Sequence, residues 1–199
     1  MSDQLRVFFA AALSPEARAS AADAVERLRP SAPPEVRWVP AESQHLTLKF
    51  LGEIQEDHVE RLVERARAKL AAVQPFEVSL AGFGAFPSAR EARVLWLGIA
   101  RGAAALAKLA RKLDAAARVA GAERERRPFA AHLTLGRLRE PARIELERLA
   151  PPESVAWTVA EVVLYESRLT PGGARYVPLA HLPLGAGEGV SNDEFAPES

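Results

Sequence analysis

The segment His45-Leu46-Thr47-Leu48 occurs a second time 87 residues later, as His132-Leu133-Thr134-Leu135. The same offset places Arg6-Val7 on Arg93-Val94, so two separate landmarks share one register without a gap. Self-similarity at a fixed offset indicates a duplicated structural unit. We therefore predict a bilobal, duplicated α+β fold with pseudo-two-fold symmetry. In this fold two mostly antiparallel sheets flank a central cleft, and the helices pack outside them.

The segments around the two motifs have the patterns of strands and helices. Ser14-Pro15 is typical of a helix start, because serine caps the first turn and proline lacks only an N–H that has no helical partner there. A second helix is predicted over 59–70 from apolar residues at helical spacing, and a similar stripe over 106–117 repeats it in the other half. Strands are predicted over 76–83 and 94–100.

The domain organisation follows from the duplication. We expect a single bilobal domain over residues 1–184, with repeats of roughly 4–90 and 91–184. From residue 185 to 199 the chain turns to glycine, serine, asparagine and acidic residues. Such a composition buries too little apolar surface to fold, so we predict a disordered acidic tail.

Composition excludes several classes of protein. The 199 residues are 48% hydrophobic and contain no cysteine, which excludes disulfide scaffolds, thiol catalysis and cysteine-ligated metals. The 26 positive charges balance 26 negative ones, whereas proteins that wrap long nucleic acids are strongly basic. No apolar run is long enough to span a bilayer, and the first apolar segment follows Asp3 and reads as a strand rather than a signal peptide. We expect a cytoplasmic protein.

The duplicated motif suggests acid–base chemistry. In a strand, His45 and Thr47 share one face and the two leucines share the other, and the same holds for His132 and Thr134. A neutral imidazole can take a proton from an attacking oxygen while a protonated one donates to the leaving oxygen, and an unperturbed pKa near 6.5 makes both states accessible. Threonine hydroxyls can stabilise the charge that develops on phosphate oxygens. Because a catalytic zinc site usually needs three protein ligands, we expect no metal and no cofactor.

Four further residues are candidates for substrate binding. Strict alternation places Arg137 on the leucine face, so a role in the site requires a bend or twist at the strand end, which Gly136 permits. Lys49 has the parity of the histidine and threonine before it, and either adds positive potential to the site or leaves the sheet edge for solvent. Trp38 and Phe129 each precede a motif, and either stack on a terminal base or pack in the core.

The motifs and their surroundings together resemble the 2H phosphoesterase superfamily, and within it the RNA 2′,3′-cyclic phosphodiesterase (2′–5′ RNA ligase-like) family. The resemblance covers residues from roughly 4 to 182. It rests on Arg6-Val-Phe-Phe-Ala10, Trp38-Val39-Pro40, His45-Leu-Thr-Leu-Lys-Phe-Leu-Gly-Glu53, Gly82-Phe-Gly-Ala-Phe-Pro87, Arg93-Val-Leu-Trp96, Pro128-Phe129, His132-Leu-Thr-Leu-Gly-Arg137 and Leu164-Tyr-Glu-Ser167. One departure is Ala130-Ala131, where family members often carry a proline, and this affects the local turn.

The resemblance implies metal-independent hydrolysis of an RNA-terminal 2′,3′-cyclic phosphate to a 2′-phosphate, with a weak reverse 2′–5′ RNA ligase activity. It implies that His45 is the proton donor and His132 the proton acceptor, an order that the two near-identical motifs leave open. Thr47 and Thr134 would hold phosphate oxygens, and Arg137 would be an additional phosphate ligand.

A non-catalytic module that binds RNA ends or nucleotides is the alternative. The expected partners are RNA 3′ ends that bear a 2′,3′-cyclic phosphate, or small cyclic nucleotides. We expect no membrane and no obligate protein partner, and a monomer.

Overall fold

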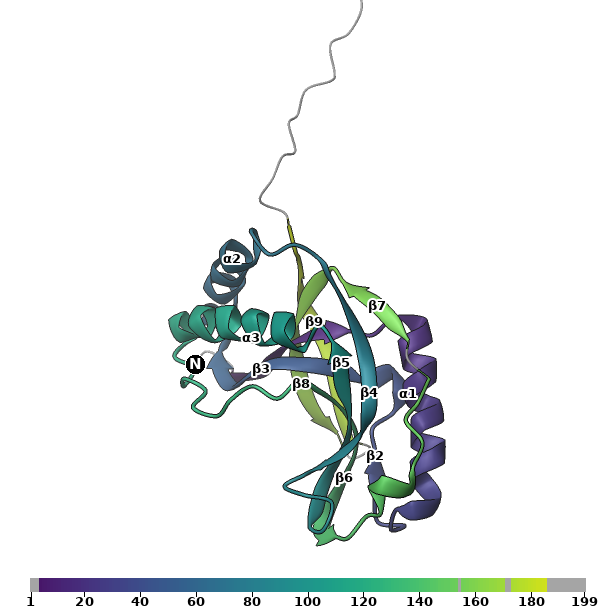
Figure 1. Ribbon diagram of the computed structural model, residues 1–199. Helices are drawn as coiled ribbons and strands as arrows, with labels where there is room; N and C mark the ends of the chain where they lie inside the picture. Colours follow the sequence, from purple (N-terminus) through teal and green to yellow (C-terminus); the bar gives the residue numbers. More distant parts are fainter. Residues whose placement is uncertain (1–3, 154, 171–172, 186–199) are drawn as a thin grey trace, which may run out of the picture.

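The computed structural model describes residues 4–153, 155–170 and 173–185, which form two antiparallel sheets with helices outside them (Figure 1). One sheet has the strand order β3-β1-β8-β9 and the other β2-β6-β5-β4-β7. The strands of the first sheet are β1 (Gln4–Ala12), β3 (His45–Gln55), β8 (Glu161–Thr170) and β9 (Gly173–Pro183). Those of the second are β2 (Arg37–Trp38), β4 (Phe76–Phe86), β5 (Ala92–Arg101), β6 (His132–Ala142) and β7 (Ala156–Val159). The predicted α+β class with two sheets is confirmed.

Each sheet contains strands from both halves of the chain. β8 and β9 lie near the C-terminal end of the chain and extend the sheet that β1 begins, while β4, from the first half, pairs with β5 from the second. The sheets therefore exchange strands instead of corresponding to the stretches before and after residue 90. The domain over residues 1–184 and its repeats of roughly 4–90 and 91–184 remain a prediction. Residues 186–199 of the predicted tail lie outside the described residues.

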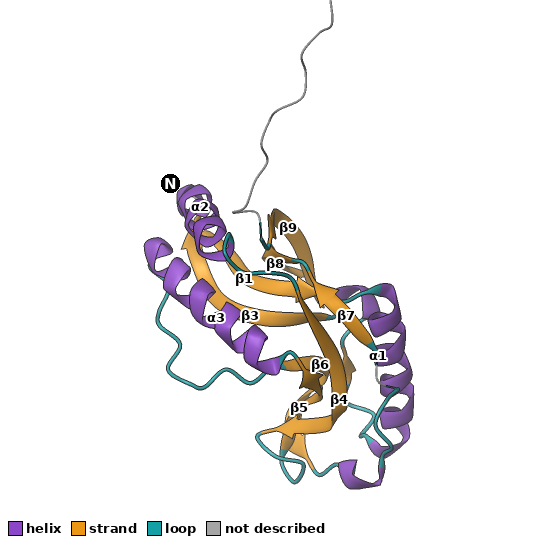
Figure 2. Ribbon diagram, turned by 45° about the horizontal axis from the view of Figure 1, so that its top comes forward, coloured by secondary structure: helices purple, strands orange, loops and turns teal. Residues whose placement is uncertain are grey.

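Two of the helices follow a strand of one sheet and lie against the other sheet. α1 (Pro15–Leu28) follows β1 of the first sheet but lies beside the second, whereas α3 (Ala103–Ala117) follows β5 of the second sheet and contacts β3 of the first (Figure 2). α2 (Val59–Leu70) packs against α3. The predicted start of α1 is confirmed, because the Ser14 hydroxyl accepts a hydrogen bond of 3.1 Å from the Ala17 N–H.

The similar apolar stripes of α2 and α3 do not make these two helices symmetry mates. By its place after β5, α3 is the counterpart of α1 and not of α2. The 87-residue offset places residues 146–157 opposite α2, and the described part of this segment contains a 3₁₀ turn, Leu146–Arg148, and the start of β7. Apolar periodicity identified the helices correctly, but it reports only which face of a helix is buried and not which helix is its symmetry mate.

The leucines of both motifs lie in the hydrophobic core. Leu46 and Leu48 are 2% and 4% exposed, and Leu133 and Leu135 are fully buried. Burial of each leucine side chain stabilises the fold by about 1.5–3 kcal/mol. The core therefore holds the leucine faces of β3 and β6 inward and leaves the histidine–threonine faces free for the cleft.

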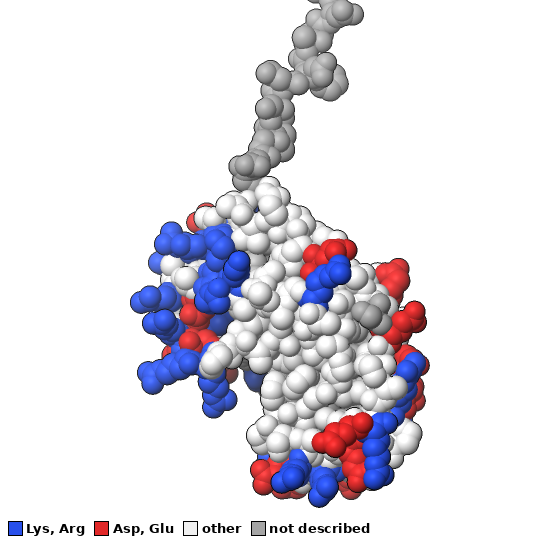
Figure 3. Space-filling view, viewed as in Figure 1, with Lys and Arg blue, Asp and Glu red and all other residues white. Residues whose placement is uncertain are grey.

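Positive charge gathers at one end of this electrically neutral chain. Lys and Arg side chains cluster over α2 and α3 (Figure 3). Exposed residues of this cluster include Arg61, Arg65, Arg67, Lys108, Arg111 and Lys112. Within the described residues no helix is long and apolar enough to cross a membrane.

Candidate active site

The two motifs lie on strands that contact each other where the sheets meet. β3 and β6 are in contact across the sheets, and each begins with its motif histidine. His45, Thr47, His132 and Thr134 are half-buried on the faces opposite the buried leucines. The fold thus places on two contacting strands the four residues that the repeated motif singled out, although the two motifs are 87 residues apart in sequence.

Both imidazoles are oriented in the same way. Nδ1 of His45 lies 2.8 Å from the Ser43 carbonyl oxygen, and Nδ1 of His132 lies 2.7 Å from that of Ala130. A carbonyl oxygen can only accept, so each Nδ1 carries the hydrogen and donates it. Nε2 of each ring is therefore the atom left to exchange a proton with a substrate. Ala130 supplies its carbonyl just as Ser43 does, so the missing proline before the second motif does not disturb this arrangement.

Aromatic rings surround both histidines. The Phe8 ring stacks on His45 at a centroid distance of 4.8 Å, and Tyr176 approaches the same imidazole edge-on at 5.1 Å. On the other side, Phe86 meets His132 edge-on at 5.0 Å and Trp96 lies 6.1 Å away. The sequence favours the core for Phe8, with a place in the floor of the cleft as the alternative, and it gives no role in the site to Phe86, Trp96 or Tyr176.

A bulge in each motif strand changes which residues face the cleft. Thr47 pairs with Ala10 and Lys49 with Phe9, so one residue of β3 is left over between the two pairs. β6 has the same irregularity between Thr134 and the next paired residue. An extra residue reverses the alternation of faces beyond it. The predicted bend after the second motif is therefore present, and the same bend follows the first.

Arg137 lies beyond the bulge of β6 and is exposed, whereas Gly136 is buried. Beyond the bulge of β3, Phe50 is the corresponding residue and is 46% exposed. The sequence favours the core for Phe50, with a place in the floor of the cleft as the alternative, whereas strict alternation gives the exposed face to Lys49.

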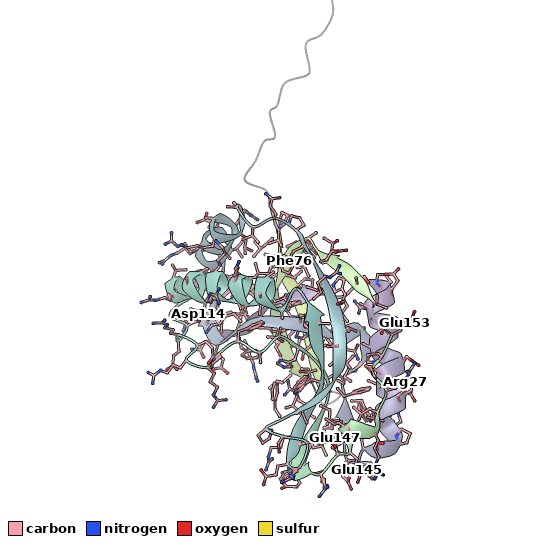
Figure 4. All side chains as sticks on the ribbon, in the orientation of Figure 1. Arg27, Phe76, Asp114, Glu145, Glu147 and Glu153 are labelled. Atoms are coloured by element: carbon pink, nitrogen blue, oxygen red, sulfur yellow. The ribbon has the colours of Figure 1, made fainter. Side chains whose placement is uncertain are left out.

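The predicted position of Lys49 in the site or at a solvent-exposed sheet edge is wrong. Its side chain is buried, with Nζ 2.7 Å from Asp114 Oδ1 on α3 and donating a hydrogen bond of 2.8 Å to the Glu123 carbonyl (Figure 4 labels Asp114). The bulge turns it away from the histidine face, so neither of the two predicted alternatives holds. Lys49 instead joins β3 to α3 and to the segment that follows this helix.

Trp38 also lies on the wrong face for base stacking. It pairs with Gly136, and a Cβ atom on that glycine would lie 3.1 Å from Trp38 Cε3. Because the side chain next along β6, Arg137, faces the cleft, Trp38 lies on the opposite face, where it packs against the core under the Arg29 guanidinium at 5.2 Å. Phe129 likewise packs half-buried against the core, which was the second alternative for it.

Arg37 is a residue that the sequence analysis missed. It pairs with Arg137 across β2 and β6, and directly paired residues of antiparallel strands project from the same face. Both arginines are exposed. Because Arg37 and Trp38 are consecutive in a strand, their side chains lie on opposite faces. Which of the two faces the cleft follows only from the pairing of β2 with β6.

The electrostatics of the cleft favour neutral histidines. Burial lowers the pKa of His45 to about 4, although the Ser43 hydrogen bond opposes this, and the Arg137 charge lowers it further. Burial and then Arg137 also lower the pKa of His132, against the hydrogen bond to Ala130. In the free protein, protonation of either ring near neutral pH therefore costs more free energy than the unperturbed pKa near 6.5 predicts. One guanidinium acts on both imidazoles, which is consistent with a shared site.

Two strands that present a histidine and a threonine to a common cleft, within a pair of strand-exchanged sheets, define a class of phosphoesterases. The family model of the 2′-5′ RNA ligase superfamily matches residues 15–170, and the chain belongs to this superfamily. The family predicted from the motifs is confirmed.

Similar proteins agree with this assignment. The chain is 35% identical to the RNA 2′,3′-cyclic phosphodiesterase of Escherichia coli over 189 residues, which are 92% of this chain and 99% of the relative. It is 35% identical to the protein of that name from Methanothermobacter thermautotrophicus over 75% of this chain and 83% of the relative. The crystal structure of E. coli LigT complexed with 3′-AMP superposes with a TM-score of 0.76 at 32% identity, covering 92% of this chain and 99% of that one.

Proposed function

We propose that this protein is an RNA 2′,3′-cyclic phosphodiesterase that hydrolyses a terminal 2′,3′-cyclic phosphate to a 2′-phosphate, with His45 and His132 as acid and base. The observation that carries the proposal is the matched orientation of the two imidazoles. Each presents Nε2 from a strand that begins at the meeting of the sheets, and each is held through Nδ1 by a backbone carbonyl two residues upstream. Binding alone would not require this matched pair.

The reaction needs two proton transfers, one at each ring. Nε2 of His132 takes a proton from the attacking water as its oxygen forms a bond to phosphorus. The bond from phosphorus to O3′ breaks, and protonated Nε2 of His45 gives its proton to the departing oxygen. The 2′-ester bond stays intact, so the products are a 2′-phosphate and a 3′-hydroxyl. General acid–base catalysis of this kind contributes about 10²–10⁴-fold to the rate.

The other polar groups of the cleft stabilise the charge of the transition state. Thr47 and Thr134 project from the same faces as the histidines and can donate hydrogen bonds to non-bridging oxygens. Arg137 supplies positive charge within electrostatic reach of both rings. Its planar guanidinium is well suited to two phosphate oxygens at once.

Substrate binding favours the protonated form of the donor histidine, which is neutral in the free protein. A cyclic phosphodiester carries one negative charge, and a nearby negative charge favours the protonated form of an imidazole. The pKa of the donor therefore rises when the substrate binds, so the active complex acquires one proton. The roles of donor for His45 and acceptor for His132 come from the family resemblance.

The test is hydrolysis of cytidine 2′,3′-cyclic phosphate in excess chelator, with separation of the 2′- and 3′-monophosphates. We expect the 2′-monophosphate alone. Absence of product, or product only after zinc is added, would contradict the proposal. His45→Ala and His132→Ala should each lower kcat by at least about 100-fold with a modest change in affinity. A binding module would instead show loss of affinity only.

The reverse reaction joins a cyclic phosphate end to a 5′-hydroxyl and forms a 2′–5′ linkage. The same two histidines would serve it, because the proton transfers run backwards. Water at about 55 M competes with a dilute 5′-hydroxyl, so hydrolysis should dominate. Ligation should appear only at high concentrations of RNA ends, and His132→Ala should abolish both directions together.

A further inference from the structure

Positive charge is concentrated on one face of the protein. Residues 59–70 and 103–127, which form α2, α3 and the segment after α3, contain eleven Lys and Arg but only five Asp and Glu, whereas the whole chain is neutral. All of these cations except Lys69 are exposed. Figure 3 shows them gathered on one side of the molecule, and we call the exposed Lys and Arg of the two ranges the basic face.

The cations of the basic face stand apart from carboxylates in the described part of the chain. Elsewhere on the surface several exposed arginines pair with a carboxylate, as Arg27 does with Asp23 at 2.6 Å and Arg101 with Glu77 at 2.8 Å. Within the described residues no Lys or Arg of the basic face forms such an ion pair. An anion from outside the chain can therefore reach these cations without displacing a carboxylate.

The spacing of the cations along both helices makes them repel one another. Arg61 and Arg65 on α2 are four residues apart in sequence, and so are Lys108 and Lys112 on α3. Residues at this spacing are neighbours on the surface of a helix, and like charges there destabilise it. A bound polyanion offsets this repulsion, so the basic face suits a ligand with several negative charges.

A buried ion pair fixes the segment that connects the basic face to the cleft. Lys49 Nζ lies 2.7 Å from Asp114 Oδ1 and donates a hydrogen bond of 2.8 Å to the Glu123 carbonyl. The same Asp114 oxygen accepts a hydrogen bond of 3.0 Å from the Glu125 N–H. The segment is thereby held beside β3, and it continues to His132, the first residue of β6 (Figures 1 and 2).

Three arginines continue the basic face along this segment, namely Arg124, Arg126 and Arg127. Arg124 precedes His132 by eight residues, so the two residues lie no more than about 29 Å apart. A nucleic-acid strand advances by about 3.4 Å per nucleotide in a helix, so about nine nucleotides cover that distance. The end of an RNA chain can therefore lie at His132 while phosphates further along the chain lie on the basic face.

We infer that the basic face binds the phosphodiester backbone of the RNA upstream of the cyclic phosphate. The inference rests on the proposed function and deepens it, because it predicts a preference for cyclic ends carried on an RNA chain over cyclic mononucleotides. Eight of the eleven cations in the two ranges are arginines, whose planar guanidinium matches phosphate oxygens. Contacts to phosphates carry no sequence information, so this binding is independent of base sequence.

The chemistry of the basic face favours a nucleic-acid backbone over a membrane. Helices that lie on a bilayer insert large apolar side chains between the lipids. Among the described residues the exposed large hydrophobic side chains are Phe50 and Leu169, which belong to β3 and β8 and not to α2 or α3. The basic face thus offers charge without an apolar anchor.

The experiment reverses charge on the basic face and, as a control, at the other end of the molecule. The face variant is Lys108→Glu, Arg111→Glu and Lys112→Glu combined, and a second variant replaces the same residues by Gln. The control makes the same change in net charge near the β4–β5 turn, where Ile144 N–H donates to the Ala89 carbonyl and Figure 4 labels Glu145. It combines Arg90→Glu, Arg143→Glu and Arg148→Glu, which are all exposed positions.

Two readouts are needed. The first is kcat/KM for cytidine 2′,3′-cyclic phosphate and for an RNA of about twelve nucleotides that ends in the same group, a length that exceeds the nine or so nucleotides needed to reach Arg124. The second is the affinity for the same RNA with a 2′-phosphate end, measured by fluorescence anisotropy between 50 and 200 mM salt. This second readout does not depend on hydrolysis.

The wild-type protein should prefer the RNA to the mononucleotide by at least about tenfold at 50 mM salt, and this preference should weaken as salt rises. The face variant should lose the preference, and the slope of log affinity against log salt should decrease by about 2 to 3, because three phosphate contacts are lost. The Gln variant should show the same change to a smaller extent. The control variant should behave as the wild type, and all variants should keep the wild-type kcat/KM for the mononucleotide.

An unchanged salt slope and RNA preference in the face variant, or an equal loss in the control variant, would overturn the inference while hydrolysis of both substrates upholds the proposed function. If the protein binds RNA through the basic face but hydrolyses neither substrate, the proposed function fails and the RNA-binding face remains. Binding of phosphatidylserine vesicles that is lost in the face variant, with RNA affinity unaltered, would identify a membrane surface and overturn the inference.

Discussion

Arg37 and Arg137 are direct partners across β2 and β6, and both exposed side chains project from the face of β6 that also carries His132 and Thr134. Like charges directly opposite each other in a sheet destabilise it. A bound anion removes this repulsion, so the pair suits a phosphate better than an empty cleft.

The arginine pair should contribute to substrate affinity. Arg37→Gln should raise KM several-fold with a small change in kcat. Arg137→Gln should raise KM and lower kcat about 100-fold, because Arg137 lies within reach of both histidines. Steady-state kinetics with cytidine 2′,3′-cyclic phosphate measures both. The exposed Arg139 on the same strand is the matched control, and an equal effect of Arg139→Gln would mean that general charge and not position is responsible.

The pH dependence of the free enzyme should be displaced to the acid side. The pKa of His45 is lowered to about 4 and that of His132 is also lowered, and catalysis needs one protonated and one neutral ring. A profile of kcat/KM reports the free enzyme, so its maximum should lie below pH 6.5 and fall as the pH rises toward neutrality. The kcat profile should lie at higher pH, because the bound anion raises both pKa values. In Arg137→Gln, loss of the positive charge should move the alkaline limb of kcat/KM upward. A maximum of kcat/KM above pH 7.5 in the wild-type protein would rule out this assignment.

Acid should destabilise the fold through His45. Its folded pKa of about 4 lies below the unfolded value, so the unfolded chain binds the proton more tightly. The stability is complete above about pH 6.5 and is lost as the pH falls, by up to about 3 kcal/mol near pH 4. His45→Gln cannot titrate and should lose less stability over this interval. Urea unfolding at pH 7 and pH 4.5 tests this, and equal losses in the two proteins would count against it.

Lys49 should matter for stability and not for substrate binding. Lys49→Met leaves the Asp114 carboxylate without its buried partner, which should cost about 3 kcal/mol in the free energy of unfolding. The double variant with Asp114→Asn should recover part of this loss, and KM should stay unchanged in both. Chemical denaturation and steady-state kinetics provide the two readouts. A large rise in KM without loss of stability would restore Lys49 as a phosphate ligand.

Gly84 should be needed for the position of Trp96. A methyl group at this position overlaps the indole, so Gly84→Ala must displace the ring that lies 6.1 Å from His132. We expect kcat to fall at least about tenfold and the near-ultraviolet circular dichroism of tryptophan to change, because tightly packed sites do not absorb an added methyl without shifting neighbours. Gly82→Ala is the control on the same strand, since its Cβ would meet only Pro151 at 4.0 Å. An identical response of both variants would show that the effect is not specific to the indole.

The repeated His-x-Thr motif made the proposed catalytic residues and the α+β fold with two sheets predictable, because alternation along a strand is a local rule. Alternation along a strand places His45 with Thr47 and buries Leu46, whatever the strand pairs with. The first helix could likewise be read from Ser14 and Pro15, since a helix cap involves neighbouring residues.

Features that depend on pairing between distant strands could not be read in this way. Gly136 permits the bend that puts Arg137 on the cleft face, but the matching bulge in β3, which puts Lys49 in the core, follows only from the register with β1. Thr47 pairs with Ala10 but the equivalent Thr134 pairs with Trp96, and this one-residue shift also depends on strand pairing. The pairing of Arg37 with Arg137 and the aromatic rings around the histidines depend on it as well. Burial, and with it the lowered pKa of His45, is a property of the assembled cleft. A local pattern records which way a side chain points relative to its neighbours, but the distance between segments far apart in the chain is set by how the sheets pack.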